Sequence, residues 1–239
     1  MVKWRRFLLP VLAVYAAVMT VAGLWVMIYP DTIPALRWRL GLSPYDAASY
    51  KGELHKYQQD QLAHAQQISV VLLGDSHMQR LDAATLHPYT VNLGIGGLRS
   101  DELMGNLPAY ERLNEADHII VSIGLNDLEH ATRAEFEKTV AALIQKLNDR
   151  QRPWVLLEIM PVDPTQPQDV TNDEIEAANM VLRSSCVAPC QFVETWGLVS
   201  DQNGNLSAAY HEGDGQHLNR EGYALLIERL QDFLLKASQ

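Results

Sequence analysis

From residue 68 to the C-terminus, short apolar segments alternate with amphipathic ones, and this pattern constrains the fold most. Several apolar segments are apolar on both faces, as expected for strands of a parallel sheet covered on both sides. The amphipathic segments repeat their apolar residues at the spacing typical of surface helices. The pattern predicts strands at 68–73, 90–93, 118–123, 154–160 and 191–193, and helices at about 99–113, 132–150, 171–185 and 219–236. It therefore predicts one α/β domain with a parallel sheet at 68–239.

The N-terminal segment predicts a membrane anchor. Lys3, Arg5 and Arg6 precede an uncharged apolar run at 7–29, and about 20 apolar residues suffice for a helix to cross a bilayer. Positive charge beside a span tends to stay in the cytoplasm, so the rest of the chain is predicted to be periplasmic or extracellular. A cleaved signal peptide is the alternative, although its apolar core normally has about 7–15 residues. We therefore expect residues 1–30 to form a cytoplasmic tip and a single transmembrane helix.

Residues 31–67 separate this anchor from the α/β domain. Pro34 and Pro44 interrupt the first part, and residues 45–66 are polar and rich in helix formers. This composition predicts a partly helical stalk or linker. A helix that stands free and a helix that packs on the domain both satisfy the pattern.

The charge of the chain bears on its partners. The formal net charge is -10, and removing the three N-terminal cations gives -13 for residues 7–239. Nucleic-acid binding depends on clusters of Lys and Arg that neutralise phosphates, so we expect no nucleic-acid partner. The sequence also has no cluster of metal ligands and no Gly-rich phosphate loop, so neither a metal nor a cofactor is predicted.

Cys186 and Cys190 are the only cysteines of the chain. In an oxidising compartment such a pair can form a disulfide across a small loop. A metal site would need further ligands beside them. We predict a structural disulfide, with two free thiols as the alternative.

A serine, a histidine and an aspartate supply the groups for nucleophilic catalysis. Ser76 follows the first predicted strand, and ligands of open α/β sheets bind at the carboxyl ends of strands. A serine is a weak nucleophile unless a base takes its proton. His217 is the candidate base, and Asp214 is the candidate group that orients its ring. Gly-Asp-Ser alone is more typical of a turn or a helix N-cap, so the prediction depends on the whole set.

Acyl transfer also requires hydrogen-bond donors for the negative charge on the tetrahedral oxygen. Gly94, Gly96 or Gly97 can offer a backbone N–H that no side chain blocks, and Asn126 can offer its side-chain amide. These residues follow two further predicted strands, so we expect them at the same edge of the sheet as Ser76. Turn and cap roles are the alternative for each of them taken alone.

Four short motifs occur in an order that is typical of one enzyme family. They are Gly-Asp-Ser at 74–76, Asn-x-Gly-x-x-Gly at 92–97, Gly-x-Asn-Asp at 124–127 and Asp-x-x-His at 214–217. Over about 68–236 the chain resembles the SGNH, or GDSL-type, hydrolases. The resemblance implies a flavodoxin-like three-layer α/β/α sandwich and a Ser-His-Asp esterase site.

The resemblance also assigns a role to individual residues. It implies that Ser76 is the nucleophile and, through its N–H, one oxyanion donor. Gly97 and Asn126 would be the other two donors. Asp214 and His217 would complete the triad.

Other residues near the motifs have weaker claims to a role. Leu98 and Arg99 stand where family members often carry Asp followed by Thr or Ser, so they alter the expected pocket. Arg99 could meet an anionic group of a substrate, or it could be solvated. His77 is not expected to be the base of Ser76, because adjacent side chains diverge. We expect His211 behind the site or at the surface, with a place in the lining of the site as the alternative. The Pro-rich loop at 161–170 is expected at the rim of the site.

These features lead us to expect a membrane-anchored, extracytoplasmic serine esterase. Its substrates would be small acyl esters, such as acetyl groups, on glycans of the cell envelope. A lipase or lysophospholipase-like lipid esterase is the first alternative, and an O-acyltransferase that uses the same serine is the second. A non-catalytic binding module is the third.

Overall fold

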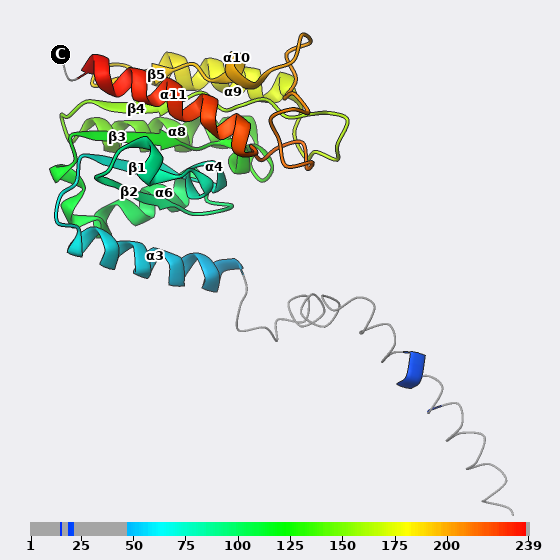
Figure 1. The fold of residues 1–239 in the computed structure, drawn as a ribbon, viewed down its shortest axis with the longest axis horizontal. Helices are drawn as coiled ribbons and strands as arrows, with labels where there is room; N and C mark the ends of the chain where they lie inside the picture. The colour runs from blue at the N-terminus through cyan, green and yellow to red at the C-terminus, as the bar shows by residue number, and fades with distance from the viewer. Residues whose placement is uncertain (1–14, 16–18, 22–46, 238–239) are drawn as a thin grey trace, which may run out of the picture. The chain divides into compact units, whose positions relative to one another are not determined.

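The computed structural model describes residues 15, 19–21 and 47–237 (Figure 1). It divides into Met1–Gly52 and a compact unit, Glu53–Gln239. The transmembrane helix predicted at 7–29 lies outside the described residues, apart from 15 and 19–21. Among the helices that are described, none is both long enough and apolar enough to cross a membrane.

The compact unit is built on a parallel sheet of five strands in the order β2-β1-β3-β4-β5. This is the strand order of flavodoxin-like doubly wound sheets, and it confirms the predicted parallel α/β architecture. The strands are β1 Val70–Gly74, β2 Thr90–Gly94, β3 His118–Ser122, β4 Trp154–Leu157 and β5 Cys190–Val193.

Helices cover both faces of this sheet. Along β1, Val71 and Leu73 belong to one hydrophobic cluster, whereas Val70 and Leu72 belong to the other. The first cluster is completed by α3 Ala47–His64, α6 Ser100–Asn106, α8 Arg133–Asn148 and α9 Asn172–Ser185. The second is completed by α4 Ser76–Arg80, α5 Ala83–Leu86, α10 Trp196–Val199 and α11 Arg220–Ala237. A short helix, α7 Leu125–Leu128, follows β3.

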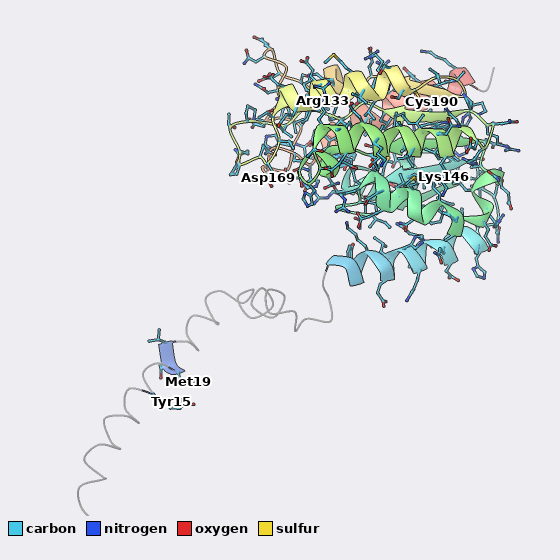
Figure 2. All side chains as sticks on the ribbon, turned by 180° about the vertical axis from the view of Figure 1, so that it is seen from behind. Tyr15, Met19, Arg133, Lys146, Asp169 and Cys190 are labelled. Atoms are coloured by element: carbon cyan, nitrogen blue, oxygen red, sulfur yellow. A yellow bond between two sulfur atoms is a disulfide. The ribbon has the colours of Figure 1, made fainter. Side chains whose placement is uncertain are left out.

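The two ends of the sheet differ in what they carry. In Figure 2, Arg133 at the start of α8 and Asp169 in the loop after β4 lie at one end of the domain. Lys146 and Cys190 lie toward the opposite end. The first of these ends is where the strands finish, and it is where ligands of such sheets bind.

Two elements end earlier than the sequence predicts. The helix expected at 99–113 stops at Asn106, and two short 3-10 turns, Leu107–Ala109 and Glu111–Glu115, replace its second half. Pro108 lies at the start of the first turn, and proline cannot continue an α-helix.

The apolar run at 154–160 also leaves the sheet early, because β4 ends at Leu157. The side chain of Asn179 donates to the Ile159 carbonyl and accepts from its N–H, both at 2.8 Å. These bonds satisfy the buried backbone where a strand ladder would otherwise do so.

The part of α3 from Glu53 to His64 belongs to the compact unit and packs on its core, so this part of the 45–66 segment is not a free helix. Leu62 is 1% exposed and belongs to the core. Arg112 Nη1 donates to the carbonyls of Leu62, Ala63 and Ala65 at 3.1, 3.0 and 2.7 Å, which satisfies the C-terminal end of the helix. The compact unit therefore includes residues from Glu53 onward that the sequence analysis assigned to the stalk.

Cys186 and Cys190 are joined by a disulfide, with their Cα atoms 5.2 Å apart. The bond closes the short connection between the end of α9 and β5, which contains the cis peptide bond Ala188–Pro189.

Candidate active site

Ser76 stands at the point where β1 ends and α4 begins. Asp75 caps this helix by accepting a hydrogen bond of 3.0 Å from the N–H of His77. Gly74 has φ +143°, and a Cβ there would lie 1.9 Å from the Ser122 carbonyl oxygen. Only glycine fits this close contact between neighbouring strands, so the sharp exit that presents Ser76 depends on the Gly of Gly-Asp-Ser.

The three predicted triad residues form one hydrogen-bonded chain. His217 Nε2 lies 3.0 Å from Ser76 Oγ, and His217 Nδ1 lies 2.6 Å from Asp214 Oδ2. An ionised carboxylate only accepts, so Nδ1 carries the proton and Nε2 is free to accept from the serine hydroxyl. This arrangement allows the imidazole to take the hydroxyl proton when the oxygen attacks.

Asp214 is held as an ionised carboxylate. Burial opposes ionisation, but the N–H groups of Gln216 and His217 donate to Oδ1 at 3.0 and 2.9 Å. Together with the bond from the His217 ring, they lower the pKa of Asp214 to about 2. Asp214 is therefore ionised at neutral pH, and its negative charge can stabilise a protonated His217.

The two remaining oxyanion candidates lie on neighbouring segments. Leu98 N donates to Ile95 O at 3.1 Å, which closes a turn, and Gly97 adopts φ +70° within it. This positive φ requires glycine, as in the third position of a type II turn. Asn126 Nδ2 donates to Leu98 O at 3.1 Å, so its amide is tied to the same turn. The second hydrogen of that amide is the one available to a ligand.

The turn at 95–98 approaches the nucleophile directly. A Cβ on Gly96 would lie 3.9 Å from the Cβ of Ser76. The N–H of Gly96 donates to Gln79 Oε1 at 2.5 Å, which ties the turn to α4. The N–H of Gly94 likewise donates to Asn92 Oδ1 at 2.9 Å, and the oxyanion role of Gly97 stays a prediction from the family motif.

A buried carboxylate behind these donors was missed by the sequence analysis. Asp127 is 3% exposed and accepts from Ser100 N at 3.1 Å and from Ser100 Oγ at 3.2 Å. Burial raises the pKa of Asp127 to about 6. The pair joins the start of α6 to α7, so it sets the distance between the second and third motifs. The one signal in the sequence was an aspartate directly after Asn126, which is also a common cap.

The remaining sequence candidates lie outside the reacting set. The ring of His77 is buried beside that of His217, with centroids 5.8 Å apart. His211 is buried and contacts Asp163, 3.2 Å away in the rim loop at 161–170. Arg99 directs both Nε and Nη2 to Asp101 at 3.2 Å, so its charge is paired with a neighbour on α6.

Within the described residues, no group of three or more His, Cys, Asp or Glu side chains is placed to hold a metal ion. At this edge of the sheet, Ser76, His217 and Asp214 supply a nucleophile, a base and a carboxylate in hydrogen-bond contact.

Comparison with known proteins gives both a family and a fold. The family model described as "GDSL-like Lipase/Acylhydrolase family" matches residues 71–225, which is more than half of the chain. A search of curated protein sequences found no match.

Solved structures share the fold at low sequence identity. A protein of Streptococcus pneumonia named for platelet activating factor superposes with a TM-score of 0.71 at 24% identity, over 77% of this chain and 92% of that one. A GDSL-like lipase from Bacteroides thetaiotaomicron gives 0.64 at 17% identity, over 78% and 99%. An acetylxylan esterase from Geobacillus stearothermophilus gives 0.56 at 16% identity, over 72% and 94%. The family match spans all the motifs around Ser76, and the chain belongs to the GDSL-like lipase/acylhydrolase family of serine ester hydrolases.

Proposed function

We propose that the chain hydrolyses carboxylic esters through an acyl-enzyme formed on Ser76. The observation that carries this proposal is the chain of 3.0 Å and 2.6 Å contacts from Ser76 Oγ through His217 to Asp214 Oδ2. His217 Nε2 takes the hydroxyl proton as Oγ bonds to the ester carbonyl carbon. The carbonyl oxygen becomes an oxyanion that accepts from the N–H groups of Ser76 and Gly97 and from the Asn126 amide.

Collapse of this intermediate breaks the bond between the carbonyl carbon and the alcohol oxygen. The departing alcohol takes the proton from His217, and the acyl group stays on Ser76. Water then gives a proton to His217 and attacks the acyl carbon, and the same donors hold the second oxyanion. The carboxylic acid leaves, and Ser76 regains its proton from His217.

For the substrate we propose small acyl groups, such as acetyl, on envelope glycans. An acidic body with a net charge of -13 over residues 7–239 disfavours anionic lipid surfaces as the main substrate. One protein with the same fold is an acetylxylan esterase, which acts on a glycan. Lipid esters are the second candidate, because other proteins with this fold are named lipases and an anchor would keep the site beside lipid.

We also propose that residues 7–29 anchor the chain and that the domain lies in the periplasm or outside the cell. The cations before this run and the run itself support the anchor. The Cys186–Cys190 disulfide supports an oxidising compartment. Carbonate extraction of membranes and protease treatment of spheroplasts test the proposal. An anchored chain resists extraction, and its domain is digested from outside; a chain that is extracted, or protected in intact spheroplasts, contradicts it.

The test of activity is hydrolysis of p-nitrophenyl esters from acetyl to palmitoyl by the full chain and by its Ser76→Ala variant. The wild-type chain should turn over the acetyl ester, and the variant should not, at an unchanged melting temperature. A steep fall in kcat/KM beyond short chains favours deacylation of glycans, whereas a rise favours lipid esters. Turnover that survives in Ser76→Ala would refute the mechanism. Acyl transfer to an added sugar in preference to water would reassign the enzyme as a transferase.

A further inference from the structure

The loop that carries Asp214 is organised around the buried ring of His211. The N–H groups of Gly213 and Gly215 donate to His211 Nδ1 at 2.9 and 3.1 Å. Its side chain is only 4% exposed, so water does not replace these bonds. A ring nitrogen that accepts must carry no proton, so the proton of neutral His211 lies on Nε2.

Asp163 accepts a hydrogen bond from this Nε2–H group. His211 Nε2 lies 3.2 Å from Asp163 Oδ2, and Thr165 donates to the same carboxylate from N and from Oγ1, both at 2.9 Å. The hydrogen bond from the Thr165 N–H has the largest effect on Asp163, and with the bonds from Thr165 Oγ1 and His211 it outweighs the effect of burial. The pKa of Asp163 is therefore lowered, and the carboxylate stays an acceptor. The carboxylate thus selects the Nε2–H tautomer, which leaves Nδ1 open to the two glycines.

The two glycines flank the triad aspartate. Gly213 and Gly215 adopt φ +97° and +75°, a backbone conformation that most other residues avoid. His211 Nδ1 is the common acceptor of both N–H groups. The backbone of residues 213–215 therefore bends around His211 Nδ1, and Asp214 lies between the two glycines that bond this atom.

The rim loop at 161–170 also bonds this segment. Asp163 N donates to Gly215 O at 2.8 Å, and Gln168 Nε2 donates to Asp214 O at 2.9 Å. A Cβ on Gly215 would lie 2.5 Å from Gln168 Nε2 and 2.7 Å from the Cβ of Gln166. These contacts leave no room for a side chain at residue 215, and the two hydrogen bonds add to those that hold the backbone around Asp214.

We propose that His211 is a positioning residue, which holds the backbone around Asp214 so that this carboxylate meets His217 Nδ1. The proposal rests on the roles proposed above for Ser76, Asp214 and His217. His211 and His217 then carry opposite tautomers in one loop. His211 accepts at Nδ1 and donates at Nε2, whereas His217 donates at Nδ1 and accepts at Nε2.

Two amide variants separate this role from simple filling of space. In His211→Asn the side-chain oxygen stands about where Nδ1 stands, so both glycine N–H groups keep an acceptor. In His211→Gln the polar atoms stand one bond further out, near Nε2, and the two N–H groups lose theirs. Misplacing a catalytic group by about 1 Å can cost about 10²-fold in rate. We therefore expect kcat to fall about 10- to 100-fold in His211→Gln and no more than about threefold in His211→Asn.

The measurements are kcat and KM for p-nitrophenyl acetate, the rate of phosphonylation of Ser76 by a fluorophosphonate, and the melting temperature, all on the full chain. Phosphonylation depends on activation of Ser76 by His217 but not on deacylation, so it should follow kcat across the variants. KM should change little, because His211 is buried against Asp163 and the backbone of its own loop. His64→Gln, an exposed histidine of α3, serves as the control and should match the wild type.

The outcomes separate the two proposals. A wild-type chain that neither hydrolyses the ester nor labels at Ser76 would refute the proposed function itself. An active wild type with equal losses in His211→Asn and His211→Gln would overturn only the positioning role. So would a fall in melting temperature with unchanged kcat and phosphonylation, since that is the behaviour of a purely structural residue. Loss in His211→Gln with recovery in His211→Asn supports the inference.

Discussion

The ring of His77 packs beside that of His217, with ring centroids 5.8 Å apart and planes inclined by 35°. Among the described residues, His77 Nδ1 is the one fully buried side-chain nitrogen or oxygen without a hydrogen-bond partner. Burial, followed by the charges of His217 and Arg80, lowers the pKa of His77 to about 3. His77 is therefore neutral near pH 7 and places no second positive charge beside the imidazolium that His217 becomes in the proposed reaction.

Replacing His77 by Phe should make the domain less sensitive to acid. The folded pKa of about 3 lies below the ordinary value of 6.5, so the unfolded chain binds more protons between these two pH values. Acidification through this window therefore lowers the free energy of unfolding, by up to about 1.4 kcal/mol per pH unit for one group. Urea unfolding at about pH 7 and pH 4.5 measures the difference. An equally large loss in wild type and in His77→Phe would contradict the assignment.

Asp127→Asn should change the same measurement in the opposite direction. The pKa of Asp127 is raised from 3.8 to about 6, mainly by burial, so the folded chain binds more protons in that window. This contribution to the free energy of unfolding is complete below pH 3.8 and is lost as the pH rises through about 6. Asn does not titrate and makes no such contribution to the free energy of unfolding. The variant should therefore lose more stability than the wild type on acidification. A variant with the wild-type slope would show that Asp127 does not titrate in this range.

Asn126→Ala should reduce kcat about 10²- to 10³-fold with little change in KM, since an oxyanion donor acts in the transition state. The variant also loses the 3.1 Å bond to Leu98 O, so its melting temperature must be measured beside its rate. Asn126→Asp is the matched variant, because it keeps the size but puts a negative charge where the oxyanion forms. It should be at least as slow. An increase in KM alone would assign Asn126 to substrate binding.

The sequence predicts the sheet and the meeting of Ser76, His217 and Asp214 well, because both depend on local patterns. Apolar runs at the right spacing predict β1 to β5, and parallel strands bring Ser76 and Asn126 to one edge. Asp214 and His217 are close in the chain, so a single loop can present both. Gly74 and Gly97 are also set by local structure, because the backbone at each position has a positive φ that favours glycine. Both therefore stand in short motifs that the sequence shows.

The supporting contacts could not be predicted, because they join residues distant in sequence that belong to no motif. His211 meets Asp163, 48 residues away, and Ser100 meets Asp127, 27 residues away. Each pair forms only once the helices and loops have been placed side by side. The early end of β4 has the same origin, because Asn179 of α9 bonds the Ile159 backbone.

Gln58 provides a last test, because it links α3 to the active-site edge of the sheet. It is 3% exposed, its Nε2 donates to Gly94 O at 2.8 Å, and its Oε1 accepts from Tyr110 Oη at 3.4 Å. Gly94 ends β2, the outer strand on this side of the described sheet, and it directly precedes the turn that contains Gly97.

Gln58→Leu would leave the buried Gly94 carbonyl without this partner, and such a group costs about 1–3 kcal/mol in the free energy of unfolding. We expect a loss of that size by urea unfolding, together with a lower kcat, because the turn beyond Gly94 carries Gly97, the candidate oxyanion donor. Gln61→Leu is the control, since Gln61 is exposed on the same helix and bonds only Tyr57 among the described contacts. It should change stability by no more than about 0.5 kcal/mol. Equal effects of the two substitutions would mean that α3 is merely attached to the domain, whereas a specific loss in Gln58→Leu makes the helix part of the catalytic framework.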